Sequence, residues 1–214
     1  RDLHYPLRRQ RQMCIRDSSG TVPTRLFCDK SKRLLNVASS LLKIKKRPTV
    51  HIVFSVQEEF NLRGVLPVIN SLKPDIAIQV DLTLTSDTPD MSNSSDVTLG
   101  EGPCMSLFSF HGRGTLNGVI PHPSIVEIFE KAAKSKKINL QRSVASGILT
   151  DASYVQFANK GIATIDVGFP MRYSHSSREV CNLHDLIDLK NLLITAINKI
   201  CLLYTSPSPR DRQK

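Results

Sequence analysis

Residues 49–65 read TVHIVFSVQEEFNLRGV, and this stretch decides the fold class. Its first part, Thr49–Ser55, is rich in β-branched and apolar residues, which is typical of a buried strand in a parallel sheet. The adjacent carboxylates Glu58 and Glu59 then stand where this strand meets the next helix. Open α/β sheets place their ligand crevices at this end of the strands. The pair is therefore a candidate site, although carboxylates at a helix start also simply complement the helix dipole.

The rest of the chain continues the alternation of strands and helices, interrupted by a long polar loop at residues 84–103. Helices are expected at 31–47, 63–72, 122–133, 152–158 and 186–200, and strands at 76–80, 105–110, 138–144 and 162–167. Strands separated by helical segments indicate an α/β fold with a mostly parallel sheet.

Composition narrows the class of protein. The five cysteines are scattered without a CxxC pair, which argues against a disulfide framework and a structural zinc knot. No apolar run approaches the roughly 20 residues of a membrane span, so a cytoplasmic protein without membrane contact is expected. The net charge of +10 suggests nucleic acid at first sight, but half of it lies in the two ends. The remainder lacks interleaved aromatic residues, and nucleic acid is not expected as a partner.

Both ends differ in character from the middle of the chain. Residues 1–18 and 201–214 are basic and resemble translated sequencing linkers, so they are expected to be foreign tails. Genuine basic arms are the alternative. Residues 19–200 would then be an internal part of a longer protein.

Three candidate metal ligands follow predicted strands, namely Glu59, Asp81 and His175. Oxygen and imidazole ligands suit zinc, cobalt or manganese, and a set without cysteine favours a catalytic over a structural site. Glu58 would remain a free base. Each residue also has an ordinary explanation, because Asp81 suits a turn and a histidine in a polar loop is commonly a surface residue.

Together the segments VQEEFNLRGV, PDIAIQVDLT, LGEGP, HPSIVEIFEKAA and MRYSHSSREV resemble the glutamyl aminopeptidase family of co-catalytic metallopeptidases, which includes the tetrahedral TET aminopeptidases. The resemblance covers roughly residues 28–200. It implies a three-layer α/β/α sandwich of the phosphorylase/hydrolase type, here without its N-terminal part. It also implies two divalent metal ions, zinc or cobalt, peptide substrates, and a homo-oligomer for the full-length protein.

The resemblance assigns roles to individual residues. Glu58 would be the general base, Glu59 and His175 would bind one metal ion, and Asp81 would bind the other. Thr150 and Asp151 would line the substrate cleft, although capping a helix explains them as well.

Two departures from the family pattern matter. In the family, a carboxylate bridges the two metal ions. When the sequence is aligned with the family motif without a gap, this position falls on Cys28, and a shift of one residue places it on Asp29. Asp29 is preferred because carboxylates bridge such cations readily. The family's upstream His-x-Asp motif and small β domain are missing. The chain alone is therefore expected to be inactive. A glycan hydrolase, which would work with two carboxylates, and a non-catalytic α/β interaction domain are the alternatives.

Overall fold

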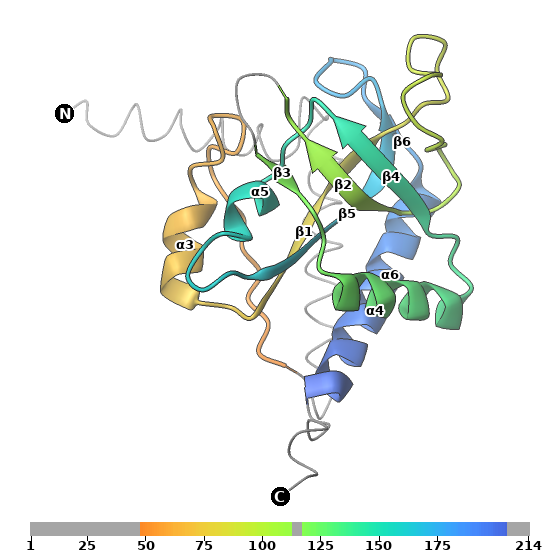
Figure 1. Ribbon diagram of the computed structural model, residues 1–214. Coiled ribbons are helices and arrows are strands. Elements are labelled where there is room, and N and C mark those ends of the chain that lie inside the picture. Colours follow the sequence, from red (N-terminus) through yellow and green to blue (C-terminus); the bar gives the residue numbers. More distant parts are fainter. Residues whose placement is uncertain (1–47, 113–116, 205–214) are drawn as a thin grey trace, which may run out of the picture.

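A mixed six-stranded sheet forms the centre of the computed structural model, which describes residues 48–112 and 117–204 (Figure 1). Its main path runs β1–β5–β2–β3, while β4 pairs with β2 and β6 with β5. The two parallel ladders, β1 with β5 and β2 with β4, are the longest. The antiparallel ladders join only short stretches. The strands are β1 Ile76–Leu84, β2 Cys104–Phe110, β3 Gly118–Val119, β4 Gln141–Ser146, β5 Ala163–Arg172 and β6 Val180–Cys181.

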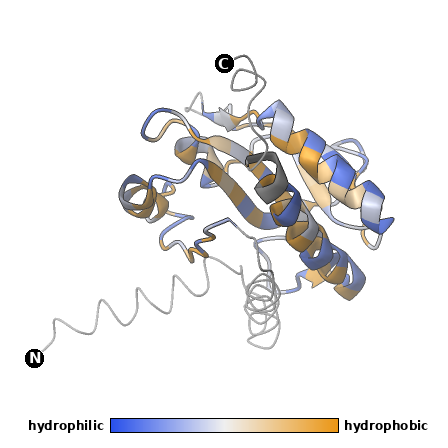
Figure 2. Ribbon diagram, turned by 90° about the horizontal axis from the view of Figure 1, so that it is seen from below, coloured by the Kyte–Doolittle hydropathy of each residue, from blue (hydrophilic) through white to orange (hydrophobic). Residues whose placement is uncertain are grey.

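Helices cover both faces of this sheet. On one face, α4 (Pro123–Lys136) and α6 (Leu183–Tyr204) pack against β5 and enclose the main apolar core, which includes Phe129, Ile165 and Leu192. On the other face, α3 (Val65–Leu72) and α5 (Ala152–Val155) form a smaller apolar cluster. Figure 2 shows hydrophobic and hydrophilic residues side by side on these helices, as expected for helices with one buried face. The arrangement is a three-layer α/β/α sandwich.

Local sequence explains where α4 begins and ends. The Nδ1 atom of His122 accepts a hydrogen bond from the backbone N–H of Ser124, and Pro123 occupies the first turn. Lys137 adopts a left-handed conformation after the last turn, as helix C-caps commonly do. Lys131 and Glu127 form an ion pair one turn apart on this helix. His122 therefore has a structural role at this helix start.

The long loop between β1 and β2 is fixed at both ends. The buried Asp185 carboxylate of α6 accepts hydrogen bonds from the backbone N–H groups of Gly100 and Gly102, each at 2.9 Å. Near the start of the loop, Asp87 pairs with Arg172 of β5. These contacts hold the loop against the sheet.

One predicted strand is wrong. Residues Thr49–Ser55 form no strand, and Val50, Ile52 and Phe54 are more than one-third exposed. The composition favours an extended backbone, but a strand needs a neighbour to complete its hydrogen bonds. Within the described residues, β1 pairs only with β5. The expected β-α-β unit around Glu58 is therefore incomplete.

The ends of several other predicted strands and helices differ from those in the structure. The strand expected to end before Asp81 continues to Leu84, so Asp81 lies within the β1–β5 ladder. The strand expected at 162–167 runs to Arg172, and α6 continues to Tyr204, into the segment predicted as a tail. The two-residue strands β3 and β6 were not predicted. The helix expected at 31–47, Cys28, Asp29 and the outermost parts of both tails lie outside the described residues.

None of the helices within the described ranges combines the length and apolarity needed to cross a membrane.

Candidate active site

A cleft of about 1380 Å³ extends along β1, lined by residues of β5, α3 and α5 and, on the other face of the sheet, by residues of α6. Every predicted site residue within the described ranges lines it: Glu58, Glu59, Asp81, Thr150, Asp151 and His175. Asp29 cannot be placed because it lies outside those ranges. The cleft therefore collects residues that are up to 117 positions apart in the sequence.

Glu59 and His175 face each other across the mouth of the cleft. The Nε2 atom of His175 lies 3.3 Å from Oε1 of Glu59, and both side chains are substantially exposed. The backbone N–H of His175 donates to the Glu179 carboxylate at 2.9 Å, which fixes the loop after β5. His175 itself has a φ of 63°, a conformation that is uncommon for residues other than glycine. Such backbone strain is concentrated at functional sites, which agrees with a site at this loop.

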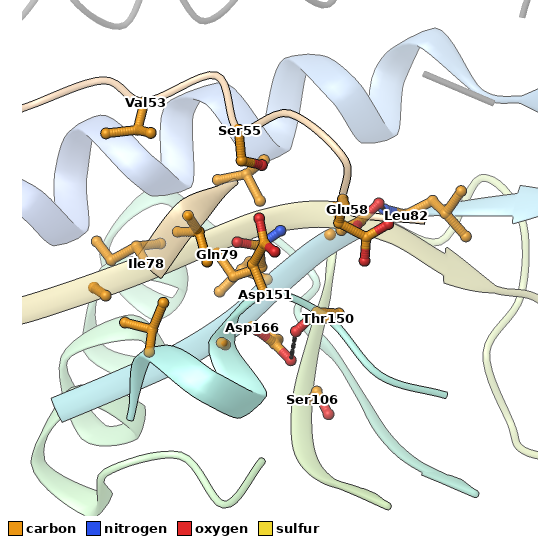
Figure 3. A pocket seen from close by; sticks show the side chains of 18 of the residues that line it. Val53, Ser55, Glu58, Ile78, Gln79, Leu82, Ser106, Thr150, Asp151 and Asp166 are labelled. Atoms are coloured by element: carbon orange, nitrogen blue, oxygen red, sulfur yellow. Dashed lines mark hydrogen bonds between the residues drawn. The ribbon is translucent and has the colours of Figure 1, made fainter. Parts of the chain in front are cut away.

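Glu58 occupies a tight turn between the irregular segment and α3. The turn is held by backbone hydrogen bonds from Leu62 to Glu58 and from Arg63 to Gln57, and Gln57 takes a left-handed conformation with a φ of 58°. Glu58 is half-buried, and Figure 3 shows its carboxylate in the cleft, apart from the Thr150–Asp166 pair. Both glutamates line the cleft, and Glu59 makes the contact with His175 described above.

Asp81 enters the cleft from the middle of β1. One of its carboxylate oxygens accepts a hydrogen bond of 2.7 Å from the backbone N–H of Leu82. Its partner in the ladder is Gly168 of β5. A Cβ atom at Gly168 would come within 2.4 Å of the Asp81 carbonyl oxygen, so this close approach of the strands requires glycine.

A second acidic group, not predicted from the sequence, lies deeper in the cleft. Asp166 of β5 is 7% exposed, and its Oδ2 accepts a 2.9 Å hydrogen bond from the Thr150 hydroxyl (Figure 3). Burial raises the pKa of Asp166 to about 7, and the charges of Asp81 and Asp151 add to this effect, while the Thr150 bond opposes it. Asp151 is 1% exposed, and burial raises its pKa as well, against a hydrogen bond with Ser55. Thr150 and Asp151 thus belong to a buried acidic cluster, and the Asp151 side chain makes no capping bond to α5.

The sequence did contain a signal for Asp166. It is the single charged residue in the run 162–169, most of which is apolar and where a buried strand was predicted. A carboxyl group in such a strand needs a polar partner or a function, since burial of an isolated charge is costly.

Two of the predicted metal ligands, Glu59 and His175, have donor atoms placed as a metal centre requires. Glu59 and His175 offer a carboxylate oxygen and an imidazole nitrogen that already face each other, which suits two ligands of one zinc-type ion. Within the described residues, no three histidine, cysteine, aspartate or glutamate side chains are close enough to hold an ion together.

Comparison with known proteins decides the family. Residues 31–192 match the model of the family described as M42 glutamyl aminopeptidase. The chain belongs to this family. The M42 membership confirms the resemblance drawn from the motifs, and the α/β sandwich agrees with it.

Two solved structures and one curated relative illustrate the similarity. The putative aminopeptidase SgcX of Escherichia coli K12 is 41% identical over 175 residues, covering 82% of this chain and 46% of the relative. An aminopeptidase from Desulfurococcus kamchatkensis is 30% identical with a TM-score of 0.69, covering 81% of this chain and 49% of that one. The TET1 peptidase of Pyrococcus horikoshii, which can assemble into a tetrahedron or a large octahedral shell, is 25% identical with a TM-score of 0.63, covering 76% and 45%. The chain spans about half the length of these proteins.

Proposed function

We propose that residues 19–200 are the C-terminal part of the catalytic domain of a metal-dependent aminopeptidase that removes N-terminal residues from peptides. The observation that carries this proposal is the single cleft shared by Glu58, Glu59, Asp81 and His175, in a chain of the M42 family. The terminal segments 1–18 and 201–214 are proposed to be foreign to this domain, although α6 extends to Tyr204 within the second segment.

Each side chain has a proposed task. Glu59 and His175 would hold one divalent ion and Asp81 would hold a second, with Asp29 as the ligand shared between them. When bound, zinc or cobalt ions at these positions would lower the pKa of a water molecule and polarise the scissile carbonyl. Glu58, which remains in the cleft beside the Glu59–His175 pair, would take the proton from the attacking water and pass it to the departing amine. Asp81 would also orient the free α-amino group of the substrate.

The chain alone is proposed to be inactive. The described residues supply two facing ligands at one position, and the family's upstream histidine motif is absent from the sequence. The complete protein is proposed to be cytoplasmic and to form a homo-oligomer, as the TET1 relative does.

Hydrolysis of aminoacyl-p-nitroanilides tests this function directly. The complete protein is expected to turn over these substrates with cobalt or zinc present and to lose activity to a chelator. The 214-residue chain is expected to show little turnover under the same conditions. Chelator-resistant hydrolysis of a glycan by the complete protein, without peptidase activity, would instead support the glycosidase alternative.

A further inference from the structure

The loop between β5 and β6 carries His175 in a backbone conformation that its residue type does not favour. His175 has a φ of 63°, and Tyr173, two residues earlier, has a φ of 58°. Residues other than glycine rarely adopt this left-handed conformation, because their Cβ atom approaches the following carbonyl oxygen. Such a conformation persists only where surrounding contacts hold it in place. The contacts around His175 therefore decide where its imidazole points.

The base of this loop is a short antiparallel ladder. Met171 pairs with Cys181 and Arg172 pairs with Val180, so both ends of the loop are joined to the sheet. Glu179 directly precedes β6 and is half-buried. Its backbone is therefore tied to the sheet, and its side chain starts from a fixed point beside the loop.

The Glu179 side chain reaches back across the loop to His175. Its Oε1 atom accepts a 2.9 Å hydrogen bond from the backbone N–H of His175. Its Oε2 atom is buried without a hydrogen-bond partner within the described residues. A buried carboxylate oxygen in this state is costly and calls for an explanation beyond stability. The bond from Oε1 to the residue that carries the imidazole supplies one.

Glu179 contacts a different part of His175 from the one that faces the cleft. Glu179 binds the backbone N–H, whereas the Nε2 atom of the imidazole lies 3.3 Å from Oε1 of Glu59. In the part of the chain that the structure describes, no three acidic, histidine or cysteine side chains are close enough to hold an ion. Glu59, His175 and Glu179 are therefore not a set of three ligands, and Glu179 acts on His175 through the backbone.

We infer that Glu179 is a positioning residue for the metal ligand His175. Its carboxylate holds the backbone N–H of His175, and the left-handed conformation fixed in this way presents the imidazole to Glu59. The bond has an ionised acceptor, which makes it stronger than a bond between neutral groups. Residues that orient a ligand contribute to the affinity of the site for its metal ion. This inference rests on the proposed function, since it takes His175 as a ligand.

Cobalt binding to the complete protein, followed by visible absorption, tests this role. Glu179→Ala removes the acceptor and is expected to raise the Kd for cobalt by about tenfold. Glu179→Gln removes the charge but keeps an oxygen that accepts the same bond, so its Kd is expected to stay within about threefold of the wild-type value. Glu101→Ala is the matched control, because Glu101 is an exposed glutamate outside the cleft, and it should leave the Kd unchanged.

Hydrogen exchange of the metal-free protein gives a second readout that does not depend on the ion. In peptides that contain His175, the amide of this residue is expected to exchange about tenfold faster in Glu179→Ala than in the wild type. Glu179→Gln is expected to restore most of the protection. Circular dichroism checks that the variants are folded.

The outcomes separate this inference from the proposed function. Unchanged cobalt affinity and exchange in Glu179→Ala would overturn the inference, even if the complete protein is an active peptidase. Equal losses in Glu179→Ala and Glu179→Gln would also overturn it, because the charge and not the hydrogen bond would then be responsible. Losses in Glu179→Ala that Glu179→Gln restores, in a complete protein that hydrolyses no peptide, would support the positioning role and reject the peptidase function.

Discussion

The Arg172 guanidinium and the Asp87 carboxylate, 85 positions apart, join through two hydrogen bonds, from Nε to Oδ1 at 2.9 Å and from Nη2 to Oδ2 at 2.7 Å. Asp87 also accepts the backbone N–H of Leu99. The hydrogen bond with Arg172 is the main cause of the lowered pKa of Asp87, and it raises the pKa of Arg172. The pair ties the loop after β1 to the end of β5, directly before the loop that carries His175.

Breaking this pair is expected to destabilise the protein. Asp87→Asn removes the charge from a bidentate, partly buried pair, with side chains 15% and 33% exposed, and should lower the free energy of unfolding by about 1–3 kcal/mol. Urea denaturation measures the effect. Glu130→Gln is the matched control, because the Glu130–Arg142 pair is 40% and 57% exposed and should contribute less than about 1 kcal/mol. Equal losses in the two variants would show that the Asp87–Arg172 pair has no special role.

Asp166 is expected to make the protein less stable as the pH rises from about 4 to about 7. Its folded-state pKa of about 7 lies above the ordinary value of 3.8, so the folded protein holds the proton more tightly. The stability from this group is fully present below 3.8 and is lost as the pH rises through about 7. Unfolding of the wild type and Asp166→Asn at about pH 5 and about pH 8 should differ in pH response by a few kcal/mol. Identical pH responses of the two proteins would contradict the raised pKa.

Metal binding is expected to depend on the two facing side chains Glu59 and His175. Glu59→Gln removes the negative charge of one ligand of the proposed ion, and His175→Gln removes the imidazole nitrogen; each should weaken cobalt binding by about tenfold or more. Visible absorption of bound cobalt follows the titration. His184→Gln is the control, since His184 is an exposed histidine outside the cleft. Equal cobalt affinity in all three variants would remove the proposed ion from this position.

Helices and strands could be predicted where the local sequence contains a recognisable pattern, such as a cap or a periodic apolar face. The helix at Pro123–Lys136 carries a cap, an N-terminal proline and a periodic apolar face, so its position follows from the sequence alone. The segment Thr49–Ser55 has the composition of a strand, but strand pairing depends on a partner that local sequence does not reveal. The strands β3 and β6 are too short to produce a periodic pattern.

Site residues could be predicted where a polar residue stands in or beside a loop. Glu58, Glu59 and His175 stand in or beside loops, and loops carry a large share of binding and catalytic residues. Asp166 lies within an apolar strand, and only the tertiary structure shows that Thr150 and Asp151 lie next to it. Its partnership with Thr150 spans 16 positions across a helix and a turn, which no local pattern encodes.

Glu58→Gln in the complete, cobalt-loaded protein tests the central claim most directly. The substitution keeps the size of the side chain and removes the base, so kcat for an aminoacyl-p-nitroanilide should fall by about 10²–10⁴-fold, with cobalt binding unchanged. A kcat that stays near the wild-type value would contradict the account, because the proton transfer assigned to Glu58 would then have another source.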